Sequence, residues 1–471
     1  MNKYVELIRN TGIIAIGKMS VQILNVLLLP IYTKYLSTEE YGQADLILTY
    51  VTLFLPIISL QVEQALFREM TISRNDKYKQ ETIVSTILTA TYALSFIIAM
   101  GGIGVSFFTR SIYGFFFTII LIASLNFNMY MYYARGIGDN SAYSLGSFID
   151  MIVMILLNIL LIGVIKIGII GMLISNFAGY IVASIVLIYR LHIFRTISLS
   201  HVKVKELPEY LKYSIPMIPN ALSWWILSAS DKLVVKTFIG LSASGILAIA
   251  HKFGNIYQTI FHMFLLAWQE SATLHKDDEN AERFFSVVFN HIVRIFGTLG
   301  LVILFATPFA FNLLIDNKYS NALNIVPLYV FSVFIGIIVG FLSGIYVAYG
   351  DSKSISWATI IGALLNIGIN VLLVSLIGIY ASPISTIMSN VVIALWRVID
   401  SRKYIKIHIK YDELFLILIL FLALIVVFFT KNRFWRIIVE LIVAVCIVFI
   451  NRHTLNLILH RGKEILDERN S

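Results

Sequence analysis

Apolar residues gather in fourteen stretches along the chain, most of them long enough to cross a bilayer as a helix. Short polar connections separate the stretches, and no connection exceeds about 25 residues. The pattern predicts an all-α polytopic membrane protein of about 14 transmembrane helices. Their approximate positions are 12–36, 42–67, 82–108, 112–135, 141–165, 168–190, 208–236, 242–272, 284–315, 323–349, 354–377, 380–398, 413–430 and 434–451.

The first two predicted helices carry polar residues along one face. On the first, Lys18, Gln22 and Asn25 follow each other at helical spacing. The second has a longer polar face, formed by Asp45, Thr49, Thr52, Pro56, Ser59 and Glu63. Charge is costly in lipid, so we expect these faces to line a wet or protein-lined interior. The alternative is that their neutral side chains hydrogen-bond across a packed bundle.

Two helices of the second half repeat this feature. The helix over 242–272 has a polar face made of Lys252, Asn255, Thr259 and His262, and the helix over 284–315 has Asn290, Arg294 and Thr298. Prolines interrupt helices at four positions, where we expect bends: Pro56, Pro216, Pro219 and Pro308. The glycines Gly336, Gly340 and Gly344 form a small-residue ridge, which is typical of close helix packing.

The composition supports the same class. Of 471 residues, 58% are hydrophobic and 13% are charged, and the mean hydropathy is +0.84. The single cysteine, Cys446, excludes a disulfide framework and a paired-cysteine metal site. The first apolar run follows Lys3 and Arg9, as in a signal peptide, but it continues to Leu36 without a small-residue cleavage site. We therefore expect a retained first helix.

The basic residues are distributed as in a membrane protein. Of the 36 Lys and Arg, 24 fall in segments on the side of the termini and 8 on the other side. This excess predicts that both termini are cytoplasmic, and it explains the net charge of +9 without nucleic acid. Four cations remain inside the predicted helices: Lys18, Lys232, Lys252 and Arg294. They bind either an anionic cargo or the carboxylates of Asp45, Glu63, Asp231 or Glu270.

The chain also contains an internal repeat. At an offset of 203, Gly42 matches Gly245, and at an offset of 212, Gly138-Asp139 matches Gly350-Asp351. Further matches keep the same order: Ser20 with Ser223, Asn158 with Asn370, and Ser175-Asn176 with Ser389-Asn390. An even-numbered unit repeated in series gives two halves of the same topology. We therefore predict six helices in 1–200, six in 201–410, and an appended pair with a basic tail in 411–471.

A motif at the end of the first helix resembles a known family. The residues are Pro30, Thr33, Lys34, Leu36, Ser37 and Glu40-Tyr41-Gly42. They resemble the signature of Wzx-type polysaccharide biosynthesis proteins, the oligosaccharide flippases of the multidrug/oligosaccharidyl-lipid/polysaccharide exporter superfamily. The resemblance implies two six-helix lobes around a central cavity, commonly with two extra helices. It also implies transport of an oligosaccharide on a polyprenyl diphosphate from the cytoplasmic to the outer leaflet.

Two sets of site residues follow. For the anionic cargo we predict Lys18, Asp45, Glu63, Lys252 and Arg294. For a coupling cation we predict Asp231, Asn366 and Asn370, because some flippases of the superfamily have a sodium site at similar positions. A carboxylate can occupy the last position there, and Asn370 departs from this. We expect sodium or a proton as the coupling ion on the basis of the resemblance. The alternative is that these three residues form hydrogen bonds across helices.

Signatures of enzymes are absent from the sequence. It contains no GxxxxGK[ST] phosphate loop, no HExxH and no GxSxG, so we predict no catalytic residues, no metal and no cofactor. Two rival functions stay open: a multidrug or cation antiporter of the same superfamily, and a membrane glycosyltransferase or polymerase. We expect a multi-pass protein of the bacterial cytoplasmic membrane whose partners are lipid-linked oligosaccharide, membrane lipids, a polysaccharide polymerase and glycosyltransferases.

Overall fold

The computed structural model describes residues 27–430 and 433–452, and in this part of the chain all regular structure is helical. The described residues divide into two compact units. The first contains the chain up to Ile249 together with Leu314–Tyr319 and Ile367–Ser382, and the second contains the remainder. Lys18, which we predicted to contact the cargo, lies outside the described residues.

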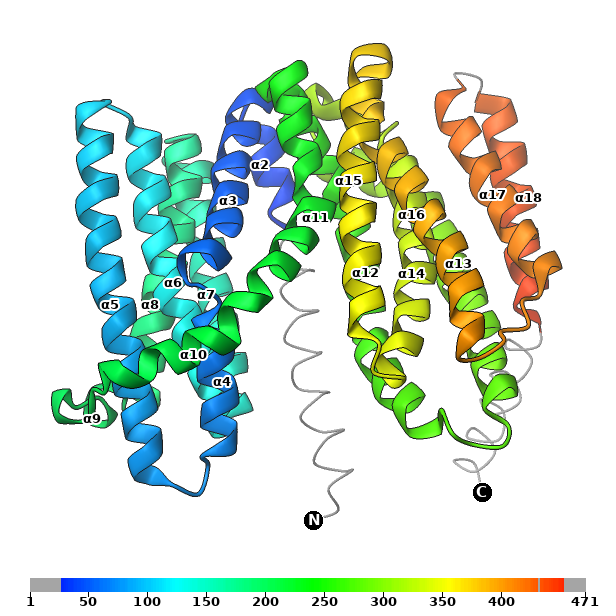
Figure 1. Ribbon diagram of the computed structural model, residues 1–471. Helices are drawn as coiled ribbons and strands as arrows, with labels where there is room; N and C mark the ends of the chain where they lie inside the picture. The colour runs from blue at the N-terminus through cyan, green and yellow to red at the C-terminus, as the bar shows by residue number, and fades with distance from the viewer. Residues whose placement is uncertain (1–26, 431–432, 453–471) are drawn as a thin grey trace, which may run out of the picture. The chain divides into compact units, whose positions relative to one another are not determined.

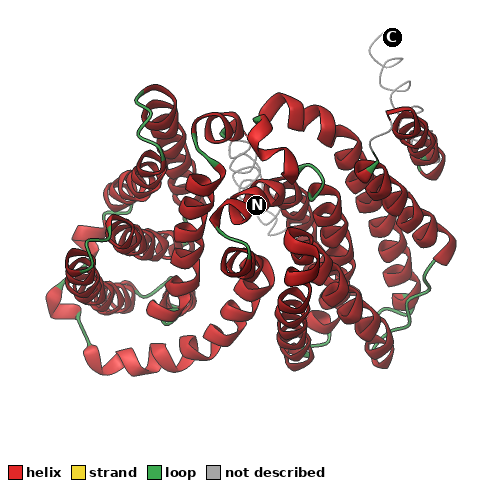
Figure 2. Cartoon of the chain, turned by 90° about the horizontal axis from the view of Figure 1, so that it is seen from above, coloured by secondary structure: helices red, strands yellow, loops and turns green. Residues whose placement is uncertain are grey.

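Each unit is a bundle of helices (Figures 1 and 2). The first contains α2 (Leu29–Tyr35), α3 (Thr38–Ile58), α4 (Val62–Ile72), α5 (Lys77–Phe108), α6 (Ile112–Ile137), α7 (Asn140–Asn158), α8 (Ile169–Arg190), α9 (Ile193–Thr196), α10 (Leu207–Ser214) and α11 (Ile218–Phe238). The following helices are α12 (Leu241–His275), α13 (Ala281–Leu314), α14 (Val326–Ala348), α15 (Ser352–Ile377), α16 (Ala381–Asp400), α17 (Tyr411–Phe429) and α18 (Arg433–Ile450).

These helices confirm the predicted apolar segments from 82–108 onward, within a few residues at each end. Nine stretches of the described residues are long and apolar enough to cross a membrane. A one-turn 3-10 segment, Ile215–Met217, separates α10 from α11 at the predicted prolines Pro216 and Pro219. Pro56 and Pro308, in contrast, lie inside α3 and α13.

The predicted single helix over 42–67 is wrong. The structure has two helices there, because Leu60 and Gln61 adopt left-handed backbone angles, with φ of 51° and 56°. Such angles cost about 1–2 kcal/mol per residue outside glycine. The Ser59 hydroxyl accepts from the Gln61 N–H at 3.1 Å, and the Gln61 amide donates to Glu63 at 3.1 Å, which offsets part of this cost. Glu63, which lies in α4, therefore does not continue the polar face of α3, whereas Ser59 is the last residue of that face.

Aromatic side chains fill the core of the second unit. The indole of Trp268 is buried, stacks on Phe341 with ring centroids 4.3 Å apart, and donates to the Phe341 carbonyl at 2.9 Å. It fits because Gly344 has no side chain, and Gly340 admits the ring of Phe261 in the same way. The predicted glycine ridge of α14 is thus a surface of close packing against α12.

The internal repeat is visible in the local geometry. Gly138 and Gly350 both have positive φ, 87° and 73°, and each ends a helix. The aspartate that follows accepts from a backbone N–H of the next helix, at 2.8 Å for Asp139 and 3.1 Å for Asp351. Each aspartate also forms an ion pair: Asp139 lies 3.6 Å from Arg190, and Asp351 lies 3.3 Å from Lys403. The two cations, like the two aspartates, are about 212 residues apart in the sequence.

The second copy of this motif is the more extensive. Hydrogen bonds from the side chains of Ser354 and Tyr404 hold the pKa of the Asp351 carboxyl below its usual range. Lys403 also contacts Asp400 at 3.0 Å. The two copies therefore repeat both the turn and its ion pair, which a shared origin of the two halves explains. The boundaries between the two six-helix halves at residue 200, and between the second half and the appended pair at residue 410, stay predictions.

Connections that were predicted to share a side of the membrane lie together within each unit. In the first, Tyr319 donates to Ser37 at 2.9 Å on one side, and Arg74 donates to Gly136 at 3.0 Å on the other. In the second, Lys276 donates to the Ala348 carbonyl at 3.1 Å. Three pairs of connections that were assigned to the same side thus contact each other, and the assignment of the sides, with both termini cytoplasmic, stays a prediction.

The starts of α3 and α12 meet in a self-complementary contact. A Cβ atom at Gly42 would overlap the carbonyl oxygen of Leu241, and one at Gly245 would overlap that of Thr38. Between them, the hydroxyls of Thr38 and Ser242 are 2.7 Å apart. The matched residues differ by 203 positions, so each turn contacts the other as in a twofold interface. Only glycine permits this approach.

We expect Gly42→Ala and Gly245→Ala each to destabilise the protein by about 1–3 kcal/mol, because the added methyl forces the two turns apart. Thermal unfolding of the purified protein in detergent measures the effect. The matched control is Gly104→Ala on α5, where a Cβ has open space. Equal melting temperatures for Gly42→Ala and the control would contradict the close contact.

Candidate functional site

A buried ion pair joins α3 to α11. The Lys232 ammonium lies 2.6 Å from an Asp45 carboxylate oxygen, and both side chains are largely buried. One and two turns further along α3, Trp225 donates its indole N–H to the Thr49 carbonyl at 3.2 Å and to the Thr52 hydroxyl at 3.1 Å. The predicted polar face of α3 is therefore partly a contact surface for α11. For Asp45, the geometry favours the salt-bridge alternative.

The other residues predicted for cargo lie in different places. Glu63 is buried in the first turn of α4, where Gln61 donates to one of its oxygens. No cationic side chain among residues 27–430 and 433–452 lies within ion-pair distance of it. Lys252 is half-buried on α12, beside His251, whose ring stacks on Tyr329 at 4.0 Å. Glu63 belongs to the first unit and Lys252 to the second, and their role in cargo binding stays a prediction.

Arg294 contacts the appended helices. Its guanidinium forms a two-pronged pair with Glu413 at the start of α17, with distances of 3.0 Å and 2.5 Å. The same face of α13 places Asn290 against the backbone of His408, at 2.9 Å. Further along, Thr298 accepts from Asn451 at 2.9 Å. The polar face predicted for a cavity is therefore the seam that holds α17 and α18. A role of Arg294 in cargo binding stays a prediction.

Two of the three predicted cation-coupling residues contact each other. The Asn370 amide donates to the Asp231 carboxylate at 2.9 Å, and both side chains are buried. The Oδ1 atom of Asn370 accepts no hydrogen bond from the described residues. A carboxylate and a buried amide oxygen are suitable ligands for a hard cation, and the carboxylate can also take a proton.

Asn366 has different partners. Its amide donates to the hydroxyls of Thr386 at 3.0 Å and Ser385 at 3.4 Å on α16. This is the helix-to-helix contact of the alternative interpretation. Within the described part of the chain, no group of three or more His, Cys, Asp or Glu is arranged to hold a metal ion.

Several contact residues were missed by sequence reasoning. Glu413, Trp225 and Asn451 were not named, although each pairs with a residue of a predicted polar face. One signal was present in the sequence: Glu413 is an acidic residue at the edge of an apolar segment, where it could pair with a cation of a neighbouring helix such as Arg294. Lys232 was named, but its partner is Asp45 rather than the neighbouring Asp231.

The fold is similar to that of several solved membrane transporters. Solved structures with the same fold include an inward-facing multidrug resistance MATE family transporter of the MOP superfamily, with TM-score 0.67 and 16% identity, covering 83% of this chain and 98% of that chain. Lipid II flippase MurJ in an inward closed conformation matches with TM-score 0.65 and 16% identity, over 93% and 99%. The same MATE class in an outward-facing conformation matches with TM-score 0.60 and 15% identity, over 84% and 95%.

The sequence then gives the family. Residues 7–268, more than half of the chain, match the model of the polysaccharide biosynthesis protein family, and the chain belongs to that family. No curated protein matches it. The chain thus belongs to the family that the motif at Pro30–Gly42 predicted, it has the fold of these solved transporters, and its nine candidate spans among the described residues make it a multi-pass membrane protein.

We expect removal of one partner of the Asp45–Lys232 pair to destabilise the protein by about 3–5 kcal/mol, because the other charge is left buried. Lys232→Met and Asp45→Asn test this singly, and the double replacement should recover most of the loss. Thermal unfolding in detergent measures the stability, with the exposed Lys353→Met as control. Single variants as stable as the native protein would contradict a structural pair.

Proposed function

We propose that this protein is a flippase that moves an oligosaccharide, carried on a polyprenyl diphosphate, from the cytoplasmic to the outer leaflet of the inner membrane. The family match carries the proposal, because a polysaccharide biosynthesis protein with a transporter fold has a saccharide as its expected cargo. Glycosyltransferases that build the cargo and a polymerase that consumes it are the partners this proposal requires.

The extent of the structural matches supports a flippase over an antiporter. MurJ covers 93% of this chain, whereas the two MATE structures cover 83% and 84% although they match almost completely themselves. The difference of 9–10% of 471 residues is about 45 residues. A pair of helices such as α17 and α18, which span 411–450, has this length. We propose that the lipid II flippase matches this appended pair and that the MATE structures do not.

The cargo itself calls for a cationic lining. A diphosphate brings negative charge into a region where water is scarce, so basic side chains must meet it. Lys232 and Arg294 have carboxylate partners in this conformation. We propose that Lys18 and Lys252 contact the diphosphate, because both lie on polar faces of their helices, and that of Lys252 on α12 includes Asn255 and Thr259. The neutral polar residues of the same helix faces would form hydrogen bonds with the hydroxyl groups of the sugars.

Coupling to an ion gradient is the second part of the proposal. Asp231 and Asn370 would hold a sodium ion or a proton in one conformation and release it in the other. Such binding drives transport only if the two conformations differ in affinity for the ion. The two repeated halves supply the bodies that move, in the manner of transporters built from repeats.

Proteoliposomes containing the purified protein should translocate a fluorescent polyprenyl-diphosphate oligosaccharide across the bilayer. Quenching from outside measures the fraction moved, and empty liposomes provide the background. Lys252→Ala should lower the rate at least tenfold, because loss of one buried charge contact costs on the order of 1.5–3 kcal/mol. Exposed Lys353→Ala is the matched control. Export of a cationic drug without movement of the oligosaccharide would favour the antiporter.

A further variant tests the coupling. With Asp231→Asn, transport should lose its dependence on a sodium or proton gradient, because the amide cannot balance the charge of a bound ion. The same proteoliposomes with and without a gradient measure this. Transport by the native protein that ignores both gradients would refute the coupling and leave the flippase proposal standing.

A further inference from the structure

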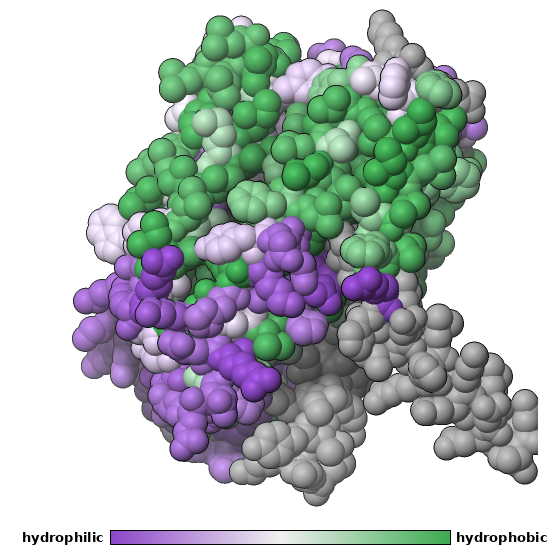
Figure 3. Space-filling model, turned by 90° about the vertical axis from the view of Figure 1, so that its right-hand side faces the viewer, coloured by the Kyte–Doolittle hydropathy of each residue, from purple (hydrophilic) through white to green (hydrophobic). Residues whose placement is uncertain are grey.

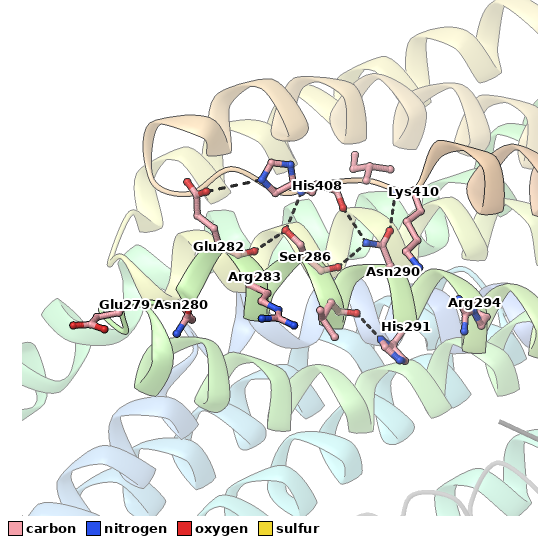
Figure 4. Close-up of a pocket in the computed structure, with 12 residues that line it drawn as sticks. Glu279, Asn280, Glu282, Arg283, Ser286, Asn290, His291, Arg294, His408 and Lys410 are labelled. Carbon is pink, nitrogen blue, oxygen red and sulfur yellow. Dashed lines mark hydrogen bonds and ion pairs between the residues drawn. The ribbon is translucent and has the colours of Figure 1, made fainter. Parts of the chain in front are cut away.

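A pocket of about 610 Å³ lies in the second unit, where the first turns of α13 meet the segment that leads into α17 (Figure 4). This size is within the range of about 300–1,000 Å³ found for small-molecule sites. Glu279, Asn280, Arg283, His291, Arg294 and Lys410 are among its lining residues. The site lies apart from Asp231 and Asn370 in sequence and in contacts.

The walls of the pocket are held by hydrogen bonds. Asn290 donates to the His408 carbonyl at 2.9 Å and accepts from the Lys410 N–H at 2.9 Å. One turn earlier, the Ser286 hydroxyl accepts from the His408 N–H at 2.9 Å. Two side chains of α13 thus satisfy the backbone of an extended segment, and this fixes the opening between them. Figure 4 shows these bonds.

The charges in the pocket are ordered along α13. Glu279 and Glu282 are at the outer end, before or at the start of the helix. Arg283 lies next to Glu282, His291 and Arg294 follow two to three turns further in, and Lys410 lies on the second wall (Figure 4). Arg294 and Lys410 share the single carboxylate of Glu413, at 2.5 Å and 3.4 Å. One positive charge therefore remains at the inner end.

Two charges at the mouth of the pocket have no partner within the described ranges. Neither Glu279 nor Arg283 lies within ion-pair distance of an opposite charge there, and Glu282 has only His408, at 4.0 Å. The ring of His291 is held by a bond of Nδ1 to the Val287 carbonyl, at 2.7 Å. Since a carbonyl only accepts, Nδ1 carries the hydrogen and Nε2 is left for a ligand.

The apolar surface begins directly beyond the inner end. Between 295 and 309 on α13, every exposed residue is apolar: Ile295, Val302, Phe305, Ala306 and Phe309. Between 415 and 426 on α17 the same holds, with Phe415, Ile419, Leu422 and Val426. Figure 3 views the side that carries α17, where apolar side chains cover the upper part and polar ones gather below. Exposed apolar faces on spanning helices contact acyl chains.

We propose that this pocket binds the head group of a zwitterionic phospholipid with a primary amine, of the phosphatidylethanolamine type. In such a lipid the phosphate lies next to the acyl chains and the ammonium lies further out. The pocket offers a similar order: Arg294 and Lys410, which exceed their shared carboxylate by one positive charge, lie next to the apolar surface, and Glu279 and Glu282 lie further from it, together with Arg283. An anionic lipid lacks a group for Glu279 and Glu282. The proposal is independent of the cargo.

Native mass spectrometry of the purified full-length protein tests this. Phosphatidylethanolamine, phosphatidylcholine and phosphatidylglycerol with identical acyl chains are the probes. We expect phosphatidylethanolamine to be retained about three- to tenfold more than either of the others, the advantage that two partly exposed charge contacts give. Glu279→Gln with Glu282→Gln should remove its preference over phosphatidylcholine. Lys410→Gln, at the inner end of the pocket, should lower retention of both.

Asp277→Asn and Lys353→Gln are the matched controls, because both residues are exposed and neither lines the pocket. Equal retention of phosphatidylethanolamine and phosphatidylcholine by the native protein would overturn the proposal, as would stronger retention of phosphatidylglycerol. Retention unchanged in the pocket variants would overturn it too. Preferential retention of a polyprenyl diphosphate would assign the pocket to the cargo and also overturn it.

Discussion

A charge inside the apolar part of a bilayer must be paired or must meet water, and two contacts that join helices of this protein follow from this requirement. Lys232 pairs with Asp45 and so joins α11 to α3. Arg294 pairs with Glu413 and so joins α13 to α17. Asp45 and Arg294, which the sequence suggested as lining of a cavity, thus hold neighbouring helices together. Glycine has the complementary role at the starts of α3 and α12, where the backbones approach too closely for a side chain.

Much of the fold could be predicted, because a membrane-spanning helix requires only a run of about 20 consecutive apolar residues, which the sequence shows directly. The apolar segments and the turns at Gly138 and Gly350 depend only on neighbouring residues, and the structure has them at the predicted places. The break at Leu60–Gln61 could not be predicted in this way. It contains no glycine and interrupts an apolar run, so surrounding structure rather than local preference maintains it.

The candidate site was harder to predict than the fold. A polar face on a helix shows that something polar lies opposite, but it does not show whether this is cargo or another helix. Asp231 and Asn370, 139 residues apart, do contact each other. Arg294 faces the appended pair, whose sequence has no counterpart in the repeat to predict the contact. Pairing between distant residues is the information that a single sequence lacks.

One measurement tests both that the protein is a transporter and that its cargo is a lipid-linked oligosaccharide. Lipid-linked saccharides are extracted from cells in which the gene is deleted and from the parent cells, and their glycans are compared. The account predicts that the complete oligosaccharide accumulates on its polyprenyl diphosphate, since assembly proceeds while export stops. A truncated or missing oligosaccharide would show a role in synthesis, and an unchanged level would show a different cargo; either result would contradict the account.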